Sequence, residues 1–477
     1  MISLLVVVLD NTILNVALRV LADPAQGLGA SQAELEWFIN SYSLVFAGLL
    51  FTFGVLGDRF GRKRFLVAGL IAFGLASLLS AYAQDPAQLV AARALMGIGG
   101  AAIMPVTLSI ISNVFDPRER GRAIGVWAGA VGLAVALGPI LGGLLLESFW
   151  WGSVFLINVP VVVIGVVAVL ALVPESRNPE PGRVDVVGVL LSIAGLVALV
   201  YGIIDGGEHG FGRPSVWAWI AAGTALLAVF IGWERRAAYP ALDVRLFRDP
   251  RFSAATASVG LVFFAAMGTF FFMAFYLQLV RGFSPLETGL LMLPFAAAQL
   301  VFAPRSAAMV ARYGPKAVAA TGLLLTAASL AGMAFLAAAT PIWLVGALFF
   351  VQGVGMANIM PPATESIMSS VPRERAGVAS AVSNTVRQVA AALGVAVIGS
   401  LVSAVYQSRV ADSVSVLPEQ VRDPAAESVA GAYAVADRLG GGGAVLIDGA
   451  NAAFVSAMHL AAGASAVVAV LGALVAR

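Results

Sequence analysis

The sequence has no cysteine and only two histidines, and these absences remove several classes of chemistry. Disulfide bonds, thiolate metal sites and cysteine nucleophiles all require cysteine. With only His209 and His459, neither a histidine metal cluster nor a Ser-His-Asp triad is expected. The pair Gly-Lys does not occur either, so the phosphate-binding loop of ATP-driven pumps is missing. We therefore expect no enzyme activity, no metal and no cofactor.

Charge is also scarce, and this decides the class of protein. Only 11% of the 477 residues are charged, against about 25% in soluble domains. Hydrophobic residues make up 60%, and the mean hydropathy is +0.94. A soluble globule of this size needs a polar surface that the composition does not supply. We predict an all-α polytopic membrane protein whose partner is the lipid bilayer and which binds no nucleic acid.

Apolar segments of about 20 residues, enough to cross a bilayer as a helix, recur along the whole chain. Charge clusters and Gly/Pro turns separate them. The first begins almost at Met1 with no basic anchor before it, so we expect the natural N-terminus to be longer. We predict fourteen spans: 1–20, 37–56, 65–83, 88–113, 122–146, 153–173, 185–206, 215–233, 253–280, 288–311, 317–338, 341–367, 377–405 and 451–475.

Lys and Arg residues are distributed unequally between the two sides of this bundle. Eighteen of the 28 lie in loops that follow even-numbered spans, and six lie in loops that follow odd-numbered spans. Cytoplasmic loops carry the excess of basic residues. The asymmetry predicts a multi-pass protein of the cell membrane (inner or plasma membrane) with both termini cytoplasmic.

The chain repeats itself at an offset of about 255 residues. The matched segments are 59–63 with 312–316, 97–101 with 353–357, and 117–120 with 372–375. Each match falls at the same place in the order of spans. We therefore predict an N-terminal six-helix bundle (1–173), two inserted helices with their linkers (174–252), and a C-terminal six-helix bundle (253–477) with an external loop at 406–450. Transporters are commonly built from such repeats, with the substrate site between the halves.

Residues 54–63, Gly-Val-Leu-Gly-Asp-Arg-Phe-Gly-Arg-Lys, closely resemble the signature loop of the major facilitator superfamily. Glycines permit a tight turn there, and a solvated basic loop alone would not explain the Gly/Asp spacing. In the family this loop latches the cytoplasmic side of the two halves. The resemblance therefore implies a gating role for six residues: Gly54, Asp58, Arg59, Gly61, Arg62 and Lys63.

Further segments resemble the fourteen-helix drug:proton antiporter branch of that superfamily. They are 9–18 in span 1, 89–93 with 97–100 in span 4, 134–143 in span 5, 155–160 and 384–388. The span-5 segment resembles the antiporter motif, which lies where the halves meet and is associated with exporters. Four-residue glycine spacing allows close helix approach, and Pro139 permits a kink. We assign a gating role to Gly138, Pro139, Gly142 and Gly143.

Asp10 is the one acid that the predicted spans place clearly within the membrane, where an ionisable group is costly and marks a functional site. Its expected partner is Arg93, which enters span 4 from the outer side. Burial favours the neutral carboxyl and a nearby arginine favours the charged form, so the group can load and release a proton. A permanent ion pair that only fixes helix packing is the alternative. The resemblance favours proton coupling by Asp10 and Arg93.

Candidate substrate contacts are polar or aromatic side chains within spans. Asn384, Arg387 and Gln388 share one face of span 13, where helix-to-helix hydrogen bonding is the alternative. The phenylalanines of span 9 are too dense to face one way, so we expect some to face lipid and others to line a wall. We predict substrate contacts at Asn15, Tyr42, Phe271, Tyr276, Asn384, Arg387 and Gln388.

Together these features predict a proton-coupled antiporter that exports small lipophilic or amphipathic compounds, as in multidrug efflux, by alternating access. We expect it to function as a monomer driven by the proton gradient. The direction of transport rests on the resemblance. A proton-coupled symporter or facilitator for a small nutrient on the same fold remains open, and so does a sensor, in which Asp10 would be dispensable.

Overall fold

The computed structural model describes residues 2–114, 134, 137–177, 184–240, 242–370, 376–415, 417–439 and 443–476, and within these ranges every regular element is a helix. Thirteen of its helical segments are long and apolar enough to cross a membrane. The all-helical membrane class is thus confirmed. The fifth predicted span is represented by the shorter apolar helix Leu137–Ser148. Apart from Ala134, the rest of that span lies outside the described residues, so the count of fourteen stays a prediction.

We call the predicted N-terminal bundle the first bundle and the predicted C-terminal bundle the second. Within the limits of the first bundle lie α1 (Ile2–Ala22), α2 (Gln32–Phe60), α3 (Arg62–Ala81), α4 (Pro86–Val114), the helix Leu137–Ser148, α6 (Ser153–Leu156) and α7 (Asn158–Leu172). Local sequence sets several of these boundaries. Ser31 and Glu34 form a capping box that begins α2 earlier than the predicted 37. Gly61, with φ +107°, breaks the chain between α2 and α3.

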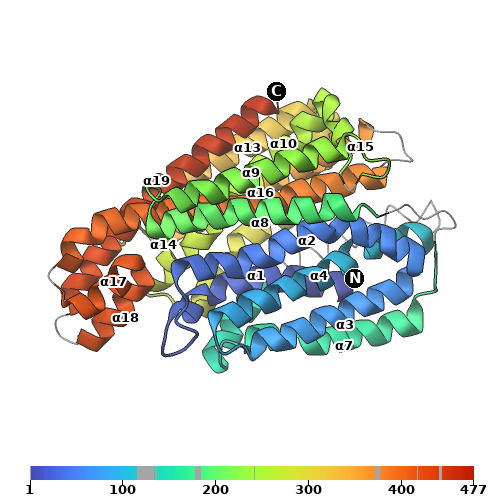
Figure 1. Ribbon diagram of the computed structural model, residues 1–477. Helices are drawn as coiled ribbons and strands as arrows, with labels where there is room; N and C mark the ends of the chain where they lie inside the picture. Colours follow the sequence, from blue (N-terminus) through green and yellow to red (C-terminus); the bar gives the residue numbers. More distant parts are fainter. Residues whose placement is uncertain are drawn as a thin grey trace.

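The inserted pair is α8 (Val186–His209) and α9 (Pro214–Glu234). Glycines in α8 and α9 let the two helices pack closely, since a Cβ at Gly223 would lie 2.4 Å from the backbone nitrogen of Leu199. α8 packs against α2 of the first bundle and α16 of the second. Figure 1 shows this green pair along the junction of the two bundles. α8 therefore bridges the two halves.

The second bundle follows a short 3₁₀ turn, η1 (Val244–Arg248). It contains α10 (Pro250–Phe275) with the π-helical turn η2 (Tyr276–Val280), α11 (Pro285–Leu291), α12 (Leu293–Tyr313), α13 (Pro315–Met333), α14 (Ile342–Ala357), α15 (Met360–Ser369), α16 (Ala376–Ser415) and α19 (Gly443–Val475). Most phenylalanines of α10 that we expected partly in lipid are buried instead: Phe270, Phe271, Phe272 and Phe275. α13, α16 and α19 cover α10, which explains their burial.

Two short helices, α17 (Glu419–Glu427) and α18 (Val429–Leu439), pack together between α16 and α19. We call them the outer cap. α16 continues to Ser415 and α19 already begins at Gly443, so both helices extend beyond the predicted limits of 405 and 451. Helix formers run without a breaker up to Pro418. Figure 1 shows the cap projecting from one end of the bundle, away from both chain termini.

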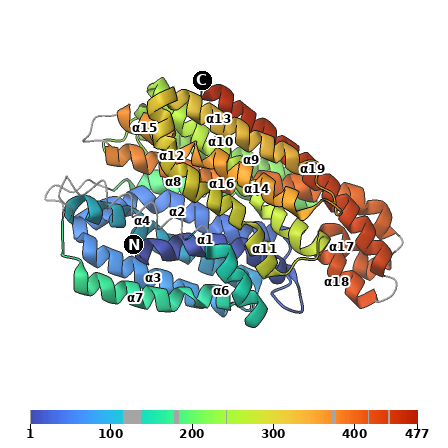
Figure 2. The same cartoon turned by 180° about the vertical axis from the view of Figure 1, so that it is seen from behind.

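We name the two ends of the bundle by the predicted topology. The outer end carries the cap and residues 23–31, and the inner end carries Gly61 and residues 174–177. At the outer end the two bundles touch: Gln278 in η2 donates from Nε2 to the Val16 carbonyl at 3.1 Å. Figure 2 shows α11 beside the outer part of the first bundle. The outer end is therefore closed.

Candidate functional site

Asp10 and Arg93 form an ion pair inside the first bundle. Asp10 lies in the middle of α1, and Arg93 lies about two turns from the start of α4. Arg93 Nη1 donates to Asp10 Oδ2. The two residues are 0% and 2% exposed. A buried pair is stable only where further hydrogen bonds satisfy its remaining polar atoms.

The guanidinium of Arg93 has additional partners on α2 and α6. Its Nε donates to the Phe38 carbonyl at 2.9 Å. Its charge lies 4.6 Å from the ring centroid of Tyr42 and 5.9 Å from that of Phe155. Such contacts are worth about 2 kcal/mol in a desolvated setting. Arg93 therefore keeps favourable contacts even if its bond to Asp10 breaks.

Asn158 is a neighbour of Asp10 that the sequence alone did not single out. Its Nδ2 donates to Asp10 Oδ1 at 3.1 Å and to Ser77 Oγ at 3.0 Å, and Ser77 in turn donates to the Phe155 carbonyl at 2.8 Å. Asn158 is 1% exposed at the start of α7. Two signals were available: an asparagine within the apolar span 153–173, and its place in the segment 155–160 that resembles the antiporter branch. Helices α1, α3, α4 and α7 thus all contribute to orienting one carboxylate.

Two of the predicted substrate residues lie beside this pair. Tyr42 is 0% exposed, stacks on Phe46 at 5.6 Å and lies against Arg93. Its hydroxyl has no hydrogen-bond partner among the described residues. Asn15 is half-buried on α1, and its Nδ2 donates to the Asn11 carbonyl at 3.1 Å. Both remain predicted contacts on the first-bundle side.

Asn384, Arg387 and Gln388 lie on α16 and are half-buried. The Arg387 guanidinium lies 5.4 Å from the ring centroid of Phe263 on α10, and its Nε has no partner within the described ranges. The neighbouring Thr385 reaches the Ala47 carbonyl of α2 at 3.5 Å. This polar segment therefore lies at the seam between the bundles, apart from the Asp10 network.

Phe271 and Tyr276, the predicted substrate contacts of the second bundle, stay predictions. Both are 0% exposed. Phe271 packs on Phe275 with ring centroids 5.8 Å apart, and the Tyr276 hydroxyl donates to the Ala337 carbonyl at 2.8 Å. In this outer-closed structure both side chains pack within the second bundle.

The helix Leu137–Ser148 connects the ion-pair region to the second bundle. A Cβ at Gly138 would lie 1.9 Å from Thr12 Oγ1, and one at Gly142 would lie 3.1 Å from Ile13 Cγ2. These α1 residues follow Asp10 by two and three positions. The absence of a side chain at both glycines is what lets this helix press against α1 beside Asp10.

The opposite face of the same helix meets α11. A Cβ at Gly143 would lie 2.4 Å from Leu286 Cα, and one at Gly289 would lie 2.3 Å from the Pro139 carbonyl oxygen. Both contacts are with backbone, which cannot rotate away. The predicted gating residues Pro139 and Gly143 therefore lie at a close contact between the bundles at the outer end.

The signature loop is held at the inner end by its own bundle and by the start of the linker after α7. Asp58 accepts from Arg62 Nε at 2.7 Å. Glu175, just after α7, accepts from the Lys63 backbone nitrogen at 3.1 Å, and a Cβ at Gly61 would lie 2.7 Å from Glu175 Oε1. Lys63 Nζ also donates to the Leu170 carbonyl at 2.8 Å. Glu175 is a second residue that the sequence reading passed over.

The other two loop residues have separate surroundings. Gly54 faces α4, where a Cβ would lie 3.6 Å from Pro105 Cβ. Arg59 is exposed and lies 5.8 Å from the Phe60 ring centroid. The resemblance implies that this loop latches the cytoplasmic side of the two halves. That latch stays a prediction.

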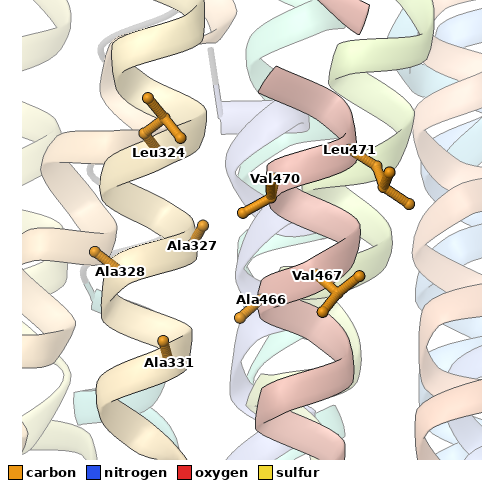
Figure 3. A pocket seen from close by; sticks show the side chains of 8 residues that line it. All are labelled: Leu324, Ala327, Ala328, Ala331, Ala466, Val467, Val470 and Leu471. Carbon is orange, nitrogen blue, oxygen red and sulfur yellow. The ribbon is translucent and has the colours of Figure 1, made fainter. Parts of the chain in front are cut away.

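Two apolar grooves mark the surface of the second bundle. One lies between α13 and α19, and Figure 3 shows its wholly aliphatic lining: Leu324, Ala327, Ala328, Ala331, Ala466, Val467, Val470 and Leu471. The other is lined by residues of α11, α12 and α14, including Trp343 and Phe350. Neither touches the Asp10 network or the polar segment of α16, and neither offers a charged group to orient a solute.

Comparison with known proteins agrees with this architecture. The sequence profile of the Major Facilitator Superfamily matches residues 1–395. The multidrug efflux pump LfrA of Mycolicibacterium smegmatis is 37% identical over 94% of this chain and 89% of its own length. The methyl viologen resistance protein SmvA of Salmonella typhimurium is 35% identical over 85% and 81% of the two chains.

A solved structure shows the same fold. A bacterial homologue of the human lysosomal transporter Spinster, in an inward-facing and unoccupied conformation, superposes with a TM-score of 0.66 at 18% identity, over 99% of this chain and 96% of that one. At such identity the likeness shows the fold alone. The profile match and the two relatives show that this multi-pass membrane protein belongs to the major facilitator superfamily.

Proposed function

We propose that the protein exports small lipophilic or amphipathic compounds in exchange for protons, by alternating access across the cell membrane. The observation that carries this proposal is the buried Asp10–Arg93 pair, held by Asn158 within the first bundle. Relatives named for multidrug efflux and methyl viologen resistance support export of drug-like compounds. No cofactor is needed, because the proton gradient supplies the energy.

In this scheme a proton that binds Asp10 at Oδ2 breaks its bond to Arg93 Nη1. Arg93 keeps the Phe38 carbonyl and the ring of Tyr42, so it is not left without partners. Asn158 still orients the carboxyl through Oδ1. The energetic cost of losing the charge pair is therefore reduced, and the protonated state becomes accessible.

Protonation of Asp10 can be transmitted to the outer end through the helix Leu137–Ser148. Gly138 and Gly142 press on α1 directly after Asp10, and the same helix meets α11 through Gly143. A packed interface of this kind has discrete arrangements and resists gradual deformation. We propose that a shift of α1 on protonation is transmitted through this helix to the contact with α11.

The setting follows from the same scheme. The chain lies in the inner or plasma membrane with both termini cytoplasmic, works as a monomer and is a transporter with no enzymatic step. The basic residues in the loops after even-numbered spans support that orientation. Export of toxic compounds by such a protein would confer drug resistance on its host.

The test uses purified protein in liposomes with a pH-sensitive dye inside and a preset proton gradient. Two probes are added, tetraphenylphosphonium as a lipophilic monovalent cation and methyl viologen as a dication. We expect at least one probe to trigger proton flux in the wild type and in Asp412→Asn, an exposed carboxylate on α16. Asp10→Asn should show none.

Equal flux in Asp10→Asn and the wild type would reject proton coupling at Asp10. Direction is read from probe movement: acid on the outer side should drive the probe outward. Inward movement under the same gradient would reject export and favour the symporter. Probe movement that is independent of the proton gradient would favour the facilitator.

A further inference from the structure

Glu36 is a second carboxylate within the membrane-spanning part of the chain. The predicted span began at 37 and left this residue in the loop, but α2 already begins at Gln32. Glu36 is 1% exposed, and its Oε2 has no hydrogen-bond partner among the described residues. Burial of an unpaired carboxylate costs several kcal/mol, so a carboxylate at this position indicates a functional site.

A buried amide lies next to it on the same face of α2. Asn40 is one helical turn further along, and residues at this spacing are neighbours on a helix surface. Asn40 is 0% exposed, and neither its Oδ1 nor its Nδ2 has a partner in the part of the chain that the structure describes. Native proteins rarely leave buried polar groups unpaired. Two adjacent unpaired side chains indicate a site that changes its partners during function.

The site lies where three parts of the molecule meet. On the second bundle, Gly399 of α16 makes room for the carboxylate, since a Cβ there would lie 2.3 Å from Glu36 Oε1. The inserted helix α8 is fixed alongside: Ser400 Oγ donates to the Ile203 carbonyl at 2.9 Å, and Gln407 Nε2 to the Glu208 carbonyl at 3.2 Å. If the outer ends of α2 and α16 separate, Glu36 loses this cover and meets water.

Among the described residues, the charged groups around the site include no Lys or Arg that forms an ion pair with Glu36. α8 contributes Asp205, Glu208 and His209, and the negative charge of the Glu208 carboxylate repels that of Glu36. His209 lies 2.9 Å from Asp205 and 3.9 Å from Glu208. α2 itself adds Glu34 and the outer cap adds Glu427, and both interact electrostatically with Glu208.

Two further helices packed on α2, α4 and α16, do not change this picture. On α4, Arg93 is committed to Asp10 and to the Phe38 carbonyl. On α16, Gly399 is the residue that faces the carboxylate. Within the described ranges no Lys or Arg forms an ion pair with Glu36.

We propose that Glu36 is a second proton-binding site, which carries a proton while the outer end is closed and releases it when α2 and α16 separate there. This inference rests on the alternating-access antiport proposed above and adds a proton that is independent of Asp10. Protonation removes the charge that burial against Gly399 and beside Glu208 disfavours. Asn40 is placed to share a hydrogen bond with the protonated carboxyl.

The test measures outer opening directly and needs no transported compound. Because the chain has no cysteine, spin labels can be attached at Gln84→Cys and Ala338→Cys, two exposed positions in outer loops of the two bundles. Pulsed electron paramagnetic resonance then gives the closed-to-open ratio as a function of pH. One proton changes this ratio by up to about tenfold per pH unit.

The decisive comparison is made in the Asp10→Asn background, which removes the first site. We expect the outer end of Asp10→Asn to open as the pH rises. The double variant, which also carries Glu36→Gln, should remain closed at every pH. Glu147→Gln, an exposed carboxylate at the end of the helix Leu137–Ser148, is the control and should keep the pH response. Glu36→Gln with an unchanged pH response would overturn the proposal.

Two further arms guard against ambiguous results. Gly399→Ala leaves Glu36 chemically intact but displaces its carboxylate. We expect this variant to favour the open state at all pH values. A closed fraction equal to that of the wild type would overturn the proposal. Replacing sodium by choline should leave the pH response unchanged, whereas its loss would identify a sodium site instead. Failure of both probes to be transported would count against the antiporter and not against this site.

Discussion

The glycine contact between the two bundles gives the sharpest prediction about gating. Gly143→Ala places a methyl group 2.4 Å from Leu286 Cα, where carbon atoms normally stay about 3.5–4.0 Å apart. The helix Leu137–Ser148 and α11 must therefore separate by about 1–1.5 Å to close. Overpacking of this kind costs about 1–3 kcal/mol.

That cost falls on the closed state alone, because the contact exists only while the outer end is closed. A difference of about 1–3 kcal/mol lowers the closed-to-open ratio about 5- to 150-fold. The spin-label pair at positions 84 and 338 should report this as a shift toward longer distances. Proton-coupled transport should fall in parallel, since closure becomes the unfavourable step.

Gly463→Ala is the matched control. Gly463 also lies within a membrane-spanning helix, α19, but an added Cβ there has nothing within 4 Å. It should leave the distance distribution and transport unchanged. If Gly143→Ala gives the same distances as Gly463→Ala, the contact with Leu286 does not limit outer closure, and the proposed route from Asp10 to α11 is wrong.

Three other predictions follow from named contacts. Asn158→Leu removes one hydrogen bond to the Asp10 carboxylate, worth about 1.5–3 kcal/mol. Probe-triggered proton flux should therefore fall at least about tenfold, while size-exclusion profiles stay normal. Full flux would contradict the role of Asn158. Gly61→Ala forces a side chain to φ +107° and toward Glu175, which should lower the free energy of unfolding by about 1–3 kcal/mol in thermal melts. Burial raises the pKa of Glu427 above its usual 4.5, and the Glu208 carboxylate raises it further. Because the folded protein binds this proton more tightly than the unfolded chain, protonation stabilises the cap at acid pH. That stabilisation is lost as the pH rises through the raised pKa. Hydrogen exchange of α17, corrected for intrinsic rates, should therefore be slower at acid pH, and Glu427→Gln should abolish the difference.

Local sequence determined much of the architecture. Runs of about 20 apolar residues can satisfy their backbone in lipid only as helices, so hydropathy alone located the spans. Ser31 with Glu34 and the glycine at 61 set helix boundaries through contacts between residues close in sequence. The pairing of Asp10 with Arg93 was also predictable, because two charges within spans of one bundle have few partners other than each other.

The tertiary structure alone decided which uncharged or boundary residues matter. Asn158 reads as one polar residue in an apolar span, and its bond to Asp10 depends on the depth and rotation of α7 against α1. Glu36 reads as a loop residue, yet α8 and α16 cover it. Tyr276 is a predicted substrate contact, and only the structure shows that its hydroxyl donates to the Ala337 carbonyl within its own bundle. Hydropathy fixes which segments are helices, whereas side-chain contacts depend on how each helix is rotated and tilted against its neighbours, and that is set by packing over the whole bundle.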